Sequence, residues 1–437
     1  MPYSVGMISL GCTKNRVDSE QVLGLLKAHG YTFEQAAEKA DILIVNTCGF
    51  IEPAKEESID TIFEMAQYKQ TGNCKLLVVT GCLAQRYEKE LLRQIPEIDL
   101  LMGVNRYDAL IEAIDAALAG KRAAYCERKK AIWEQPRVLT TPHYTCYHKI
   151  GDGCDNCCTY CAIPLIRGGY RSRDEKLILA EIAGMAKNGV REHVLVAQDT
   201  TRFGTDGGSP SKLPQLLRRA ADIEGVEWLR VLYCYPDETN LQLLETMANT
   251  KNICKYLDLP IQHIDGEILK RMNRRGSPES IKKTFKAARE MGFALRTSII
   301  VGFPGETEED FNRLMDFLTE ARLDRVGAFA FSPEEDTKAA LMPNQIPEEV
   351  KQHRLDALMG LQSDISLGNN RLRVGKTYKT LVTGTRGNGV YAGRSEFEAP
   401  EIDGNILFTA KASLVPGMFA NVLINEAQVY DLKGVSV

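Results

Sequence analysis

Four cysteines lie within eight positions of one short stretch, GDGCDNCCTYC, which covers residues 151–161. They are Cys154, Cys157, Cys158 and Cys161. Thiolates that are clustered in this way bind zinc or iron–sulfur clusters, and pairs of them carry out thiol–disulfide exchange. The spacing of the four thiols therefore decides which chemistry this stretch can perform.

The spacing disfavours two common closed metal sites. A bacterial ferredoxin run, C-x-x-C-x-x-C, that starts at Cys154 would need a third cysteine where Tyr160 stands. A structural zinc site takes two separated ligand pairs, whereas the adjacent Cys157 and Cys158 would have to face one ion across a single peptide unit. The remaining pattern is Cys154-x-x-x-Cys158-x-x-Cys161. Three such thiolates can hold three irons of a 4Fe–4S cluster and leave the fourth iron open, as a catalytic site requires.

Three further cysteines share a position relative to their predicted strands. Cys12, Cys48 and Cys82 each come just after a short apolar run, and neighbours are 36 and 34 residues apart. In an open α/β sheet, ligands bind at the carboxyl edge of the strands. We therefore expect the three thiols to meet at one edge. The alternative is three buried core cysteines, since free cysteine is often buried.

The elements that must position these thiols follow a βα pattern in the first 122 residues. The apolar runs YSVGMISLGC, ADILIVNTC and CKLLVVTGC are followed by the amphipathic stretches DSEQVLGLLKAHG, PAKEESIDTIFEMAQY and LAQRYEKELLRQI. Strands that alternate with helices predict an α/β domain with an open parallel sheet. Residues 123–142 are charged, contain two prolines and lack a clear period, so we interpret them as a linker.

Two further domains are expected after this linker. Residues 143–368 contain about six βα units, which predict a TIM-like partial (βα)6 barrel whose chemistry lies at the carboxyl ends of the strands. The cysteine loop follows the first of these strands. Residues 371–437 consist of short β-rich stretches divided by glycine turns, as in a small all-β barrel of the oligonucleotide-binding kind.

The composition limits the class of protein. The chain of 437 residues is 44% hydrophobic and 26% charged, with a net charge of −4, so it is not a polycation that binds nucleic acid along its whole length. We see neither a membrane-spanning run nor a secretory leader, and we expect a cytoplasmic protein without a membrane partner. In a reducing compartment, twelve cysteines indicate metal binding or catalysis rather than disulfides.

The cysteine loop resembles that of the radical S-adenosylmethionine superfamily, because it has the form C-x-x-x-C-x-aromatic-C after the first strand of a barrel. The chain as a whole resembles the methylthiotransferases of that superfamily, and the resemblance covers nearly its whole length. It is carried by SLGCTKNRVDSE, NTCGFIEPAKEES, TGCLAQRY, CDNCCTYCAIPLIRGGYRSR, LDLPIQH and SIIVGFPGETEEDF. In that family the C-terminal barrel is known as a TRAM domain.

The resemblance implies two 4Fe–4S clusters and S-adenosylmethionine as cofactors. One cluster would be held by Cys154, Cys158 and Cys161, whose open iron binds S-adenosylmethionine and generates a 5′-deoxyadenosyl radical. The other would be held by Cys12, Cys48 and Cys82 and would carry the sulfur that is inserted. The six other cysteines are expected to be small buried or incidental residues: Cys74, Cys126, Cys146, Cys157, Cys234 and Cys254.

The resemblance also implies contacts to S-adenosylmethionine. Tyr160 would lie against the adenine, although packing alone also explains an aromatic residue there. Gln198 and Asp199 would bind the methionine end, and Thr297 and Ile299 would flank the adenine or ribose; all four are equally compatible with plain barrel core. His263 is either a polar contact of this pocket or a histidine whose hydrogen bonds are satisfied within the protein.

The stretch VAQDTTRFG resembles the branch of the family that modifies the β-carbon of an aspartate in a small-subunit ribosomal protein, protein twelve. That branch implies the ribosomal protein, free or on the ribosome, as the substrate partner, together with an electron donor and a sulfur donor.

The rival function within the family is methylthiolation of adenosine in transfer RNA. Residues 371–437 hold eight Lys or Arg against six Asp or Glu, which supports direct RNA contact only weakly. A rival of another class is a non-catalytic iron–sulfur or zinc module that binds ribosomes or RNA.

Overall fold

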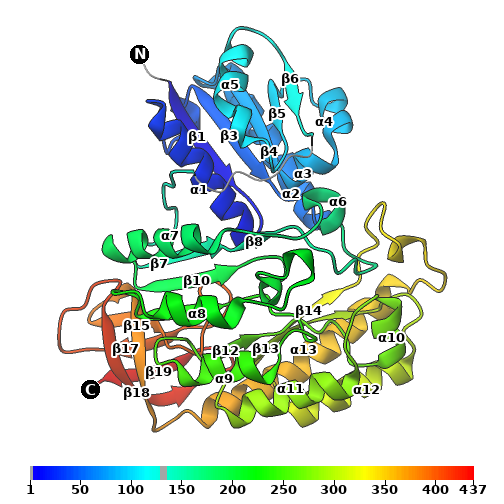
Figure 1. The fold of residues 1–437 in the computed structure, drawn as a ribbon, viewed down its shortest axis with the longest axis vertical. Helices are drawn as coiled ribbons and strands as arrows, with labels where there is room; N and C mark the ends of the chain where they lie inside the picture. Colours follow the sequence, from blue (N-terminus) through cyan, green and yellow to red (C-terminus); the bar gives the residue numbers. More distant parts are fainter. Residues whose placement is uncertain (1–2, 128–134) are drawn as a thin grey trace. The chain divides into compact units, whose positions relative to one another are not determined.

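The computed structural model describes residues 3–127 and 135–437 of the chain. They form two compact units (Figure 1). The first unit contains residues 1–140, 151–173 and 332–340, and the second contains residues 141–150, 174–331 and 341–437.

The first unit is built on a six-stranded parallel sheet with the order β2-β1-β3-β4-β5-β6. The strands are β1 (Ser4–Ser9), β2 (Thr32–Phe33), β3 (Ile42–Thr47), β4 (Leu76–Gly81), β5 (Leu100–Met102) and β6 (Ala123–Tyr125). The helices are α1 (Thr13–Ala28), α2 (Glu52–Thr71), α3 (Cys82–Arg86), α4 (Glu88–Gln94) and α5 (Leu110–Leu118), with 3-10 turns at Ala37–Lys39 and Tyr107–Ala109. The predicted βα pattern with an open parallel sheet is therefore confirmed for this part of the chain.

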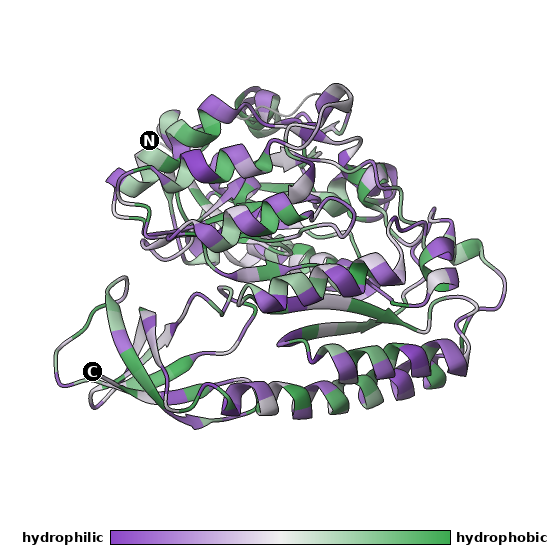
Figure 2. Ribbon diagram, turned by 60° about the horizontal axis from the view of Figure 1, so that its bottom comes forward, coloured by the Kyte–Doolittle hydropathy of each residue, from purple (hydrophilic) through white to green (hydrophobic). Residues whose placement is uncertain are grey.

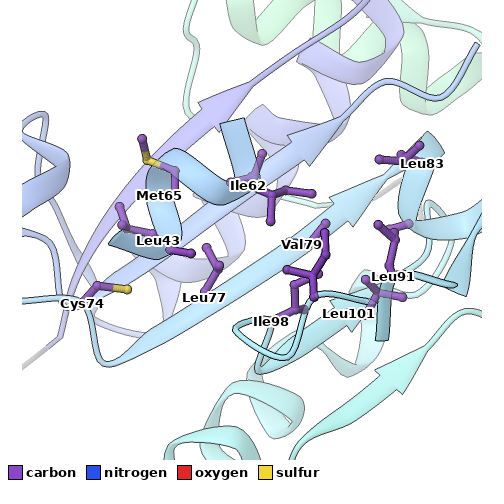
Figure 3. Packing of buried hydrophobic residues seen from close by; sticks show 14 of the residues in the cluster. Leu43, Ile62, Met65, Cys74, Leu77, Val79, Leu83, Leu91, Ile98 and Leu101 are labelled. Atoms are coloured by element: carbon purple, nitrogen blue, oxygen red, sulfur yellow. The ribbon is translucent and has the colours of Figure 1, made fainter. Parts of the chain in front are cut away.

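Both faces of this sheet are covered, as the continuous apolar runs require. On one face, Leu43 of β3 and Leu77 and Val79 of β4 pack against Ile62 and Met65 of α2 (Figure 3). Their sequence neighbours on β3 and β4 point to the opposite face, where they pack against α1 and α5. The strands β3 and β4 are buried along their whole length, which fixes where their carboxyl ends lie.

Residues 151–173 and 332–340 also belong to the first unit. The cysteine loop lies between two strands of a small antiparallel pair, β8 (Gly151–Asp152) and β9 (Arg171–Ser172), and is followed by the short helix α6 (Ile163–Arg167). The segment 332–340 is tied to this loop by the backbone N–H of Ala339, which donates to the carbonyl oxygen of Thr159 at 2.9 Å.

The second unit contains the parallel strands of the barrel, in two groups of three with the orders β11-β10-β7 and β12-β13-β14. The strands are β7 (Thr145–Lys149), β10 (Glu192–Val196), β11 (Trp228–Val231), β12 (Tyr256–Asp258), β13 (Ala294–Val301) and β14 (Arg325–Ala330). A parallel bridge between Leu229 and Ile253 joins the two groups. The chain thus has the six βα units that its sequence predicts.

Helices accompany these strands. They are α7 (Glu175–Lys187), α8 (Leu213–Ala221), α9 (Leu241–Asn249), α10 (Gly266–Arg271), α11 (Pro278–Glu290), α12 (Glu308–Ala321) and α13 (Glu348–Arg371), with 3-10 turns at Thr200–Arg202 and Asp206–Gly208. A further 3-10 turn, Ala339–Leu341, begins in the segment 332–340 of the first unit. The last and longest helix, α13, packs on β14. Hydrophilic and hydrophobic residues alternate along it in Figure 2, and its buried positions include Leu358 and Ile365.

The C-terminal part of the second unit is a closed five-stranded barrel with the order β15-β16-β17-β19-β18. Its strands are β15 (Thr377–Gly387), β16 (Val390–Arg394), β17 (Ile406–Thr409), β18 (Phe419–Ala427) and β19 (Leu432–Ser436). The barrel meets the amino-terminal ends of the parallel strands: Arg394 of β16 pairs with Glu192 of β10 at 2.6 Å, and the hydroxyl of Tyr256 in β12 donates to Asp403 at 2.7 Å. The expected all-β barrel is therefore confirmed.

The domain boundaries of the sequence analysis remain predictions. Strand β6 pairs with β5, so the first sheet continues to Tyr125, three residues into the segment interpreted as a linker. Residues 128–134 of that segment lie outside the described residues. Within the described part of the chain, we find no helix that is long and apolar enough to cross a membrane.

Candidate functional site

Cys12, Cys48 and Cys82 follow three neighbouring strands of the first sheet. Cys12 is the N-cap of α1 behind β1, Cys48 comes directly after β3, and Cys82 opens α3 directly after β4. Because β1, β3 and β4 are adjacent and parallel, their carboxyl ends bring the three thiols to one edge of the sheet. This placement is the one that the sequence predicts.

Tight backbone packing holds these thiols in place. Gly81, which precedes Cys82, has a φ of 100°, and a Cβ on it would lie 2.4 Å from Oδ1 of Asn46. A residue with a side chain would therefore be strained at this position and would also clash. The backbone of the loop that carries Cys48 lies equally close to α3, since a Cβ on Gly49 would lie 2.8 Å from the Cα of Leu83.

The surroundings of the three thiols shift their pKa values in different directions. Desolvation raises the pKa of Cys12, but the charges of Lys14 and Arg167 and two backbone N–H groups outweigh it and lower that pKa, although the residue keeps an exposed surface. Burial raises the pKa of Cys82 to about 12, and the negative charges of Cys12 and Cys48 add to the effect while Arg167 opposes it. Burial likewise raises the pKa of Cys48. The charges of the three thiols thus interact, as expected of groups that share one site.

The cysteine loop is held as a compact turn. The backbone N–H of Cys154 donates to the carbonyl of Gly168 at 3.0 Å, the N–H of Cys161 donates to the carbonyl of Cys158 at 3.0 Å, and the N–H of Ile163 donates to the sulfur of Cys161 at 3.4 Å. Cys154, Cys158 and Cys161 are half-buried, whereas Cys157 is exposed and has a φ of 51°. The side chain of Cys157 thus differs in exposure from the other three.

The cysteine loop and the three strand-end thiols are connected within the first unit. Ala162 and Ile166 at α6 pack with Cys82 and Val104. Arg167 at the end of α6 is buried and donates to Oδ1 of Asn15 at 2.7 Å and to the sulfur of Cys82 at 3.7 Å. The residues predicted from the sequence do not include Arg167. The only sequence signal for its role is its position in the stretch CAIPLIRGGYRSR, which begins at the last cysteine of the loop.

A second connection in the first unit comes from Glu334, which the sequence analysis also missed. Its carboxylate, 3% exposed, pairs with Lys55 of α2 at 3.2 Å and with Arg86 of α3 at 3.3 Å. Burial lowers the pKa of Lys55, but Glu52 and Glu334 outweigh it and raise that pKa to about 12. The segment 332–340 therefore joins the two helices that begin beside Cys48 and Cys82.

The expected contacts to S-adenosylmethionine are divided between the units. Tyr160 lies in the first unit, half-buried beside the last cysteine of the loop, and Gln198, Asp199, Thr297 and Ile299 lie in the second. Asp199 is fully buried after β10 and accepts a hydrogen bond from the hydroxyl of Thr201, while Gln198 is half-buried. Binding of S-adenosylmethionine by these five residues therefore stays a prediction.

Thr297 and Ile299 of β13 have structural contacts inside the barrel. The hydroxyl of Thr297 donates to the carbonyl of Leu259 at 2.7 Å and accepts from the N–H of Ile261 at 3.1 Å. Ile299 is fully buried and forms a parallel bridge with Gln262. These contacts are those expected of barrel core, one of the two roles that the sequence leaves open for these residues.

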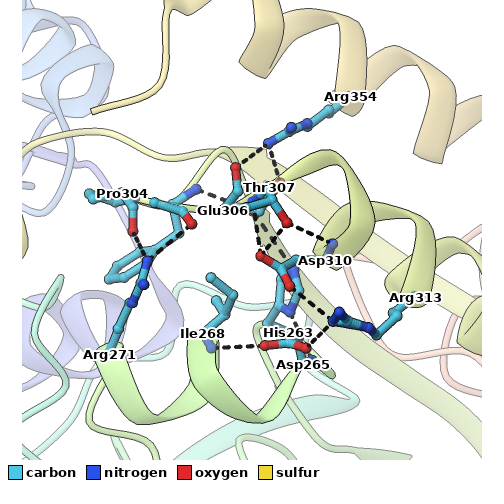
Figure 4. Close-up of polar contacts among 12 residues, drawn as sticks. His263, Asp265, Ile268, Arg271, Pro304, Glu306, Thr307, Asp310, Arg313 and Arg354 are labelled. Carbon is cyan, nitrogen blue, oxygen red and sulfur yellow. Dashed lines mark hydrogen bonds and ion pairs between the residues drawn. The ribbon is translucent and has the colours of Figure 1, made fainter. Parts of the chain in front are cut away.

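His263 belongs to a buried polar network at the carboxyl end of β12 (Figure 4). Its Nδ1 accepts from the backbone N–H of Asp265 at 2.9 Å, and its Nε2 lies 3.8 Å from Glu306, which in turn pairs with Arg354 of α13 at 2.8 Å. Burial lowers the pKa of His263 to about 4, so the ring is neutral at pH 7. Only the Nδ1 of His263 is hydrogen-bonded within the protein, because its buried Nε2 makes no hydrogen bond among the described residues, so the structure leaves both expected roles of this histidine open.

Two sets of three thiols are thus available as ligands. In residues 3–127 and 135–437, no three His, Cys, Asp or Glu side chains stand together as ligands of one metal ion. In an iron–sulfur cluster each iron takes its own thiolate, so the ligands lie around a larger group. The three strand-end thiols and the three half-buried thiols of the loop are suitable donors for such groups, because soft thiolates are what iron–sulfur clusters bind.

Three family descriptions match successive parts of the chain. Residues 4–103 match "Uncharacterized protein family UPF0004", residues 149–318 match the radical SAM superfamily, and residues 374–437 match the TRAM domain. Among solved structures, the chain is similar to the radical S-adenosylmethionine methyltransferase TsrM from Kitasatospora setae, with a TM-score of 0.56, 14% identity, and coverage of 90% of this chain and 81% of that one. The cobalamin-dependent radical enzyme OxsB gives a TM-score of 0.52 at 12% identity, covering 83% of this chain and 56% of that one. At these identities the likeness concerns the fold alone.

Curated relatives match the whole chain much more closely. The ribosomal protein uS12 methylthiotransferase RimO of Desulforamulus reducens is 50% identical, and the match covers 99% of this chain and 99% of that protein. The proteins of the same name from Clostridium botulinum strain Hall and Heliobacterium modesticaldum are 49% and 46% identical, with 99% and 100% of this chain and 97% and 96% of each relative covered. The chain therefore belongs to the RimO family of radical S-adenosylmethionine methylthiotransferases.

Proposed function

We propose that this protein is a ribosomal protein uS12 methylthiotransferase that replaces a hydrogen on the β-carbon of an aspartate of uS12 with a methylthio group. The observation that carries the proposal is the identity of 50% to a RimO protein over 99% of both chains. Such a match covers the sheet with its strand-end cysteines, the cysteine loop and the C-terminal barrel together. The proposal therefore concerns the whole chain and not one of its domains.

We assign Cys12, Cys48 and Cys82 to one 4Fe–4S cluster and Cys154, Cys158 and Cys161 to a second. When bound, the two clusters and S-adenosylmethionine supply radical generation, sulfur and the methyl group. Each set offers three thiols, which leaves one iron of each cluster without a protein ligand. The convergence of β1, β3 and β4 supports the first set, and the compact hydrogen-bonded turn supports the second.

The protein's own residues prepare these ligands. A thiol binds metal only after it loses its proton, so groups that favour the thiolate favour binding. Lys14 and Arg167 do this for Cys12, because their positive charges lower its pKa against the effect of desolvation. We further propose that Tyr160 contacts the adenine and that Gln198 and Asp199, at the carboxyl end of β10, bind the methionine end of S-adenosylmethionine.

The reaction needs partners besides uS12. Radical generation consumes electrons and the inserted sulfur must be replaced, so a reducing donor and a sulfur donor are required. We propose that the protein acts in the cytoplasm, on uS12 before or after its assembly into the small subunit.

Mass spectrometry of a deletion strain tests this function. Ribosomal proteins and digested transfer RNA are compared between the wild type, the deletion strain and a strain complemented with this chain. We expect uS12 of the deletion strain to lack the mass of one methylthio group, and complementation to restore it on an aspartate. Unchanged uS12 together with loss of a methylthioadenosine would instead assign the chain to transfer RNA.

A purified, anaerobically reconstituted protein separates an enzyme from a binding module. With dithionite and S-adenosylmethionine, we expect 5′-deoxyadenosine to form. A chain that holds iron and sulfide yet never forms this product would be a non-catalytic iron–sulfur module, and the proposed function would be wrong.

A further inference from the structure

Arg167 is the residue through which the cysteine loop contacts the strand-end thiols. It ends α6, six residues after Cys161, and is 2% exposed. Its Nη2 lies 2.8 Å from Asp18 and 3.7 Å from the sulfur of Cys82, and its Nη1 lies 3.3 Å from Asp152. The guanidinium thus contacts α1, α3 and the strand that leads into the cysteine loop.

The two carboxylates fix the guanidinium in this position. Asp18 is 1% exposed and Asp152 is fully buried, and a buried carboxylate needs a partner of opposite charge. The planar, forked guanidinium donates in several directions at once, so it can pair with both carboxylates and still point one N–H at sulfur. A lysine ammonium in its place would be a single point charge.

Asn15 shows why Arg167 matters once Cys82 becomes a ligand. The Nδ2 of Asn15 donates to the carbonyls of Leu10 and Thr47 at 3.2 and 2.9 Å, so its Oδ1 faces Arg167 and Cys82. As a thiol, Cys82 donates to this oxygen at 3.5 Å. As a thiolate, Cys82 has no proton to donate, and the amide oxygen is then only a repulsive neighbour. The Arg167 N–H remains as the donor to that sulfur.

We propose that Arg167 is a positioning residue for the cluster on Cys12, Cys48 and Cys82: it donates a charge-assisted hydrogen bond to the Cys82 thiolate and thereby raises the reduction potential of that cluster. The physical reason is that hydrogen bonds to sulfur and a nearby positive charge favour the reduced, more negative state. This inference rests on the proposed ligand assignment. It adds that a residue next to the radical-generating loop tunes the other cluster.

The test needs one cluster at a time. In the full chain with Cys154, Cys158 and Cys161 all replaced by alanine, anaerobic reconstitution with iron and sulfide loads only the strand-end site. Iron per chain and the midpoint potential, from a dithionite titration followed by electron paramagnetic resonance, are then measured without reference to activity. If this chain takes up no cluster while Arg167 is intact, the ligand assignment fails and not the role of Arg167.

Arg167→Met alone would leave the buried carboxylates of Asp18 and Asp152 without this cation, so the triple variant combines it with Asp18→Asn and Asp152→Asn. The matched comparison is Asp18→Asn with Asp152→Asn in the same background. We expect the triple variant to have a more negative midpoint potential and a changed resonance spectrum relative to this matched variant, or to lose iron from a chain whose circular dichroism is unchanged. An equal potential and equal iron content in the two variants would overturn the inference.

Two further variants complete the design. Arg167→Lys keeps the charge and removes the fork, and we expect a potential more negative than that of the parent chain, which lacks only the loop cysteines. If the triple variant does not fold, a lysine variant with the parent's potential overturns the inference by itself. Arg230→Lys changes another fully buried arginine, which pairs with Glu192 at 3.1 Å in the second unit. We expect this control to leave the potential unchanged, and a shift of equal size there would show that the effect is not specific to Arg167.

Discussion

The thiols of this chain differ in how their surroundings shift their pKa values. Burial raises the pKa of Cys126 and Cys254 to about 12, so both stay protonated at pH 7. Burial raises the pKa of Cys82, an assigned ligand, to about 12 as well, whereas the neighbours of Cys12 lower its pKa despite desolvation. The division into ligands and bystanders therefore rests on cysteine spacing and not on pKa.

Single substitutions in the loop test that division. We expect Cys154→Ala to reduce 5′-deoxyadenosine formation below detection, because the proposed radical-generating cluster would lose one of its three thiolates. Cys157→Ala should retain activity within about twofold, because this side chain is exposed and is not an assigned ligand. Product is measured by chromatography after anaerobic reconstitution. A folded but inactive Cys157→Ala protein would show that the assigned triad is wrong.

Gly81 offers a test that leaves every thiol in place. Its φ of 100° and the approach of Asn46 leave no room for a methyl group, so Gly81→Ala should destabilise the chain by roughly 1–3 kcal/mol and displace Cys82. We expect lower iron retention at the strand-end site, measured in the chain without the loop cysteines. Gly120→Ala is the control, because its φ of 87° is similarly strained but no atom lies within 4 Å of the added Cβ. Equal iron loss in both variants would mean that strain alone is responsible.

At the scale of elements, β10 joins the parallel barrel to the C-terminal barrel through one carboxylate. Glu192 pairs with Arg394 of β16 at 2.6 Å and with Arg230 of β11 at 3.1 Å, and all three side chains are buried. Burial raises the pKa of Glu192, but the two arginines outweigh it and lower that pKa to about 2. The junction is therefore held by buried charges, which cost much when one partner is removed.

This junction predicts a pH dependence of stability. Because the folded pKa of Glu192, about 2, lies below its ordinary value of 4.5, its contribution of roughly 3 kcal/mol is present above pH 4.5 and is lost as the pH falls toward 2. Glu192→Gln should therefore be destabilising at pH 6, and its difference from the wild type should shrink at pH 3. Urea unfolding of the cluster-free chain, followed by circular dichroism, measures this.

An exposed pair in the C-terminal barrel provides the control. Glu426 pairs with Lys433 at 2.8 Å, with both side chains largely exposed. Exposed ion pairs contribute little, so Glu426→Gln should barely change the free energy of unfolding at either pH. If Glu192→Gln behaved in the same way, the buried pairs would not hold the junction.

At the scale of the whole molecule, the C-terminal barrel covers charged groups of the parallel barrel. Arg230 donates to the carbonyl of Glu396 at 2.8 Å, and Lys255 donates its N–H to the carboxylate of the same residue at 3.0 Å. The two barrels are thus joined by polar contacts within the second unit. The C-terminal barrel is therefore a structural part of this unit.

Truncation after residue 372 tests this structural role. Without the C-terminal barrel, Arg230 and Glu192 lose partners, so we expect the chain to unfold at a temperature lower by at least several degrees, measured by differential scanning calorimetry. A chain that keeps its unfolding temperature and loses only methylthiolation of uS12 would show that the domain serves substrate binding alone.

The sequence by itself determined the domain order and the strand-end position of three cysteines, and it led to the proposal of a ligand triad in the loop. These features are local: apolar periodicity sets each strand, and ligand spacing along a short loop is written directly in the residues. For the same reason the sequence leaves Thr297 and Ile299 between ligand pocket and barrel core, because strand residues have the same pattern in both roles.

Only the tertiary structure decided which distant groups meet. Arg167 and Cys82 are 85 residues apart, and Glu334 lies 248 residues from Arg86, yet both pairs are in contact in the first unit. No periodicity encodes such pairs, since a buried charge is placed by the packing of several elements around it and not by its neighbours in the chain. The sequence therefore points to the thiols that we propose as ligands, and the fold places Arg167 beside one of them.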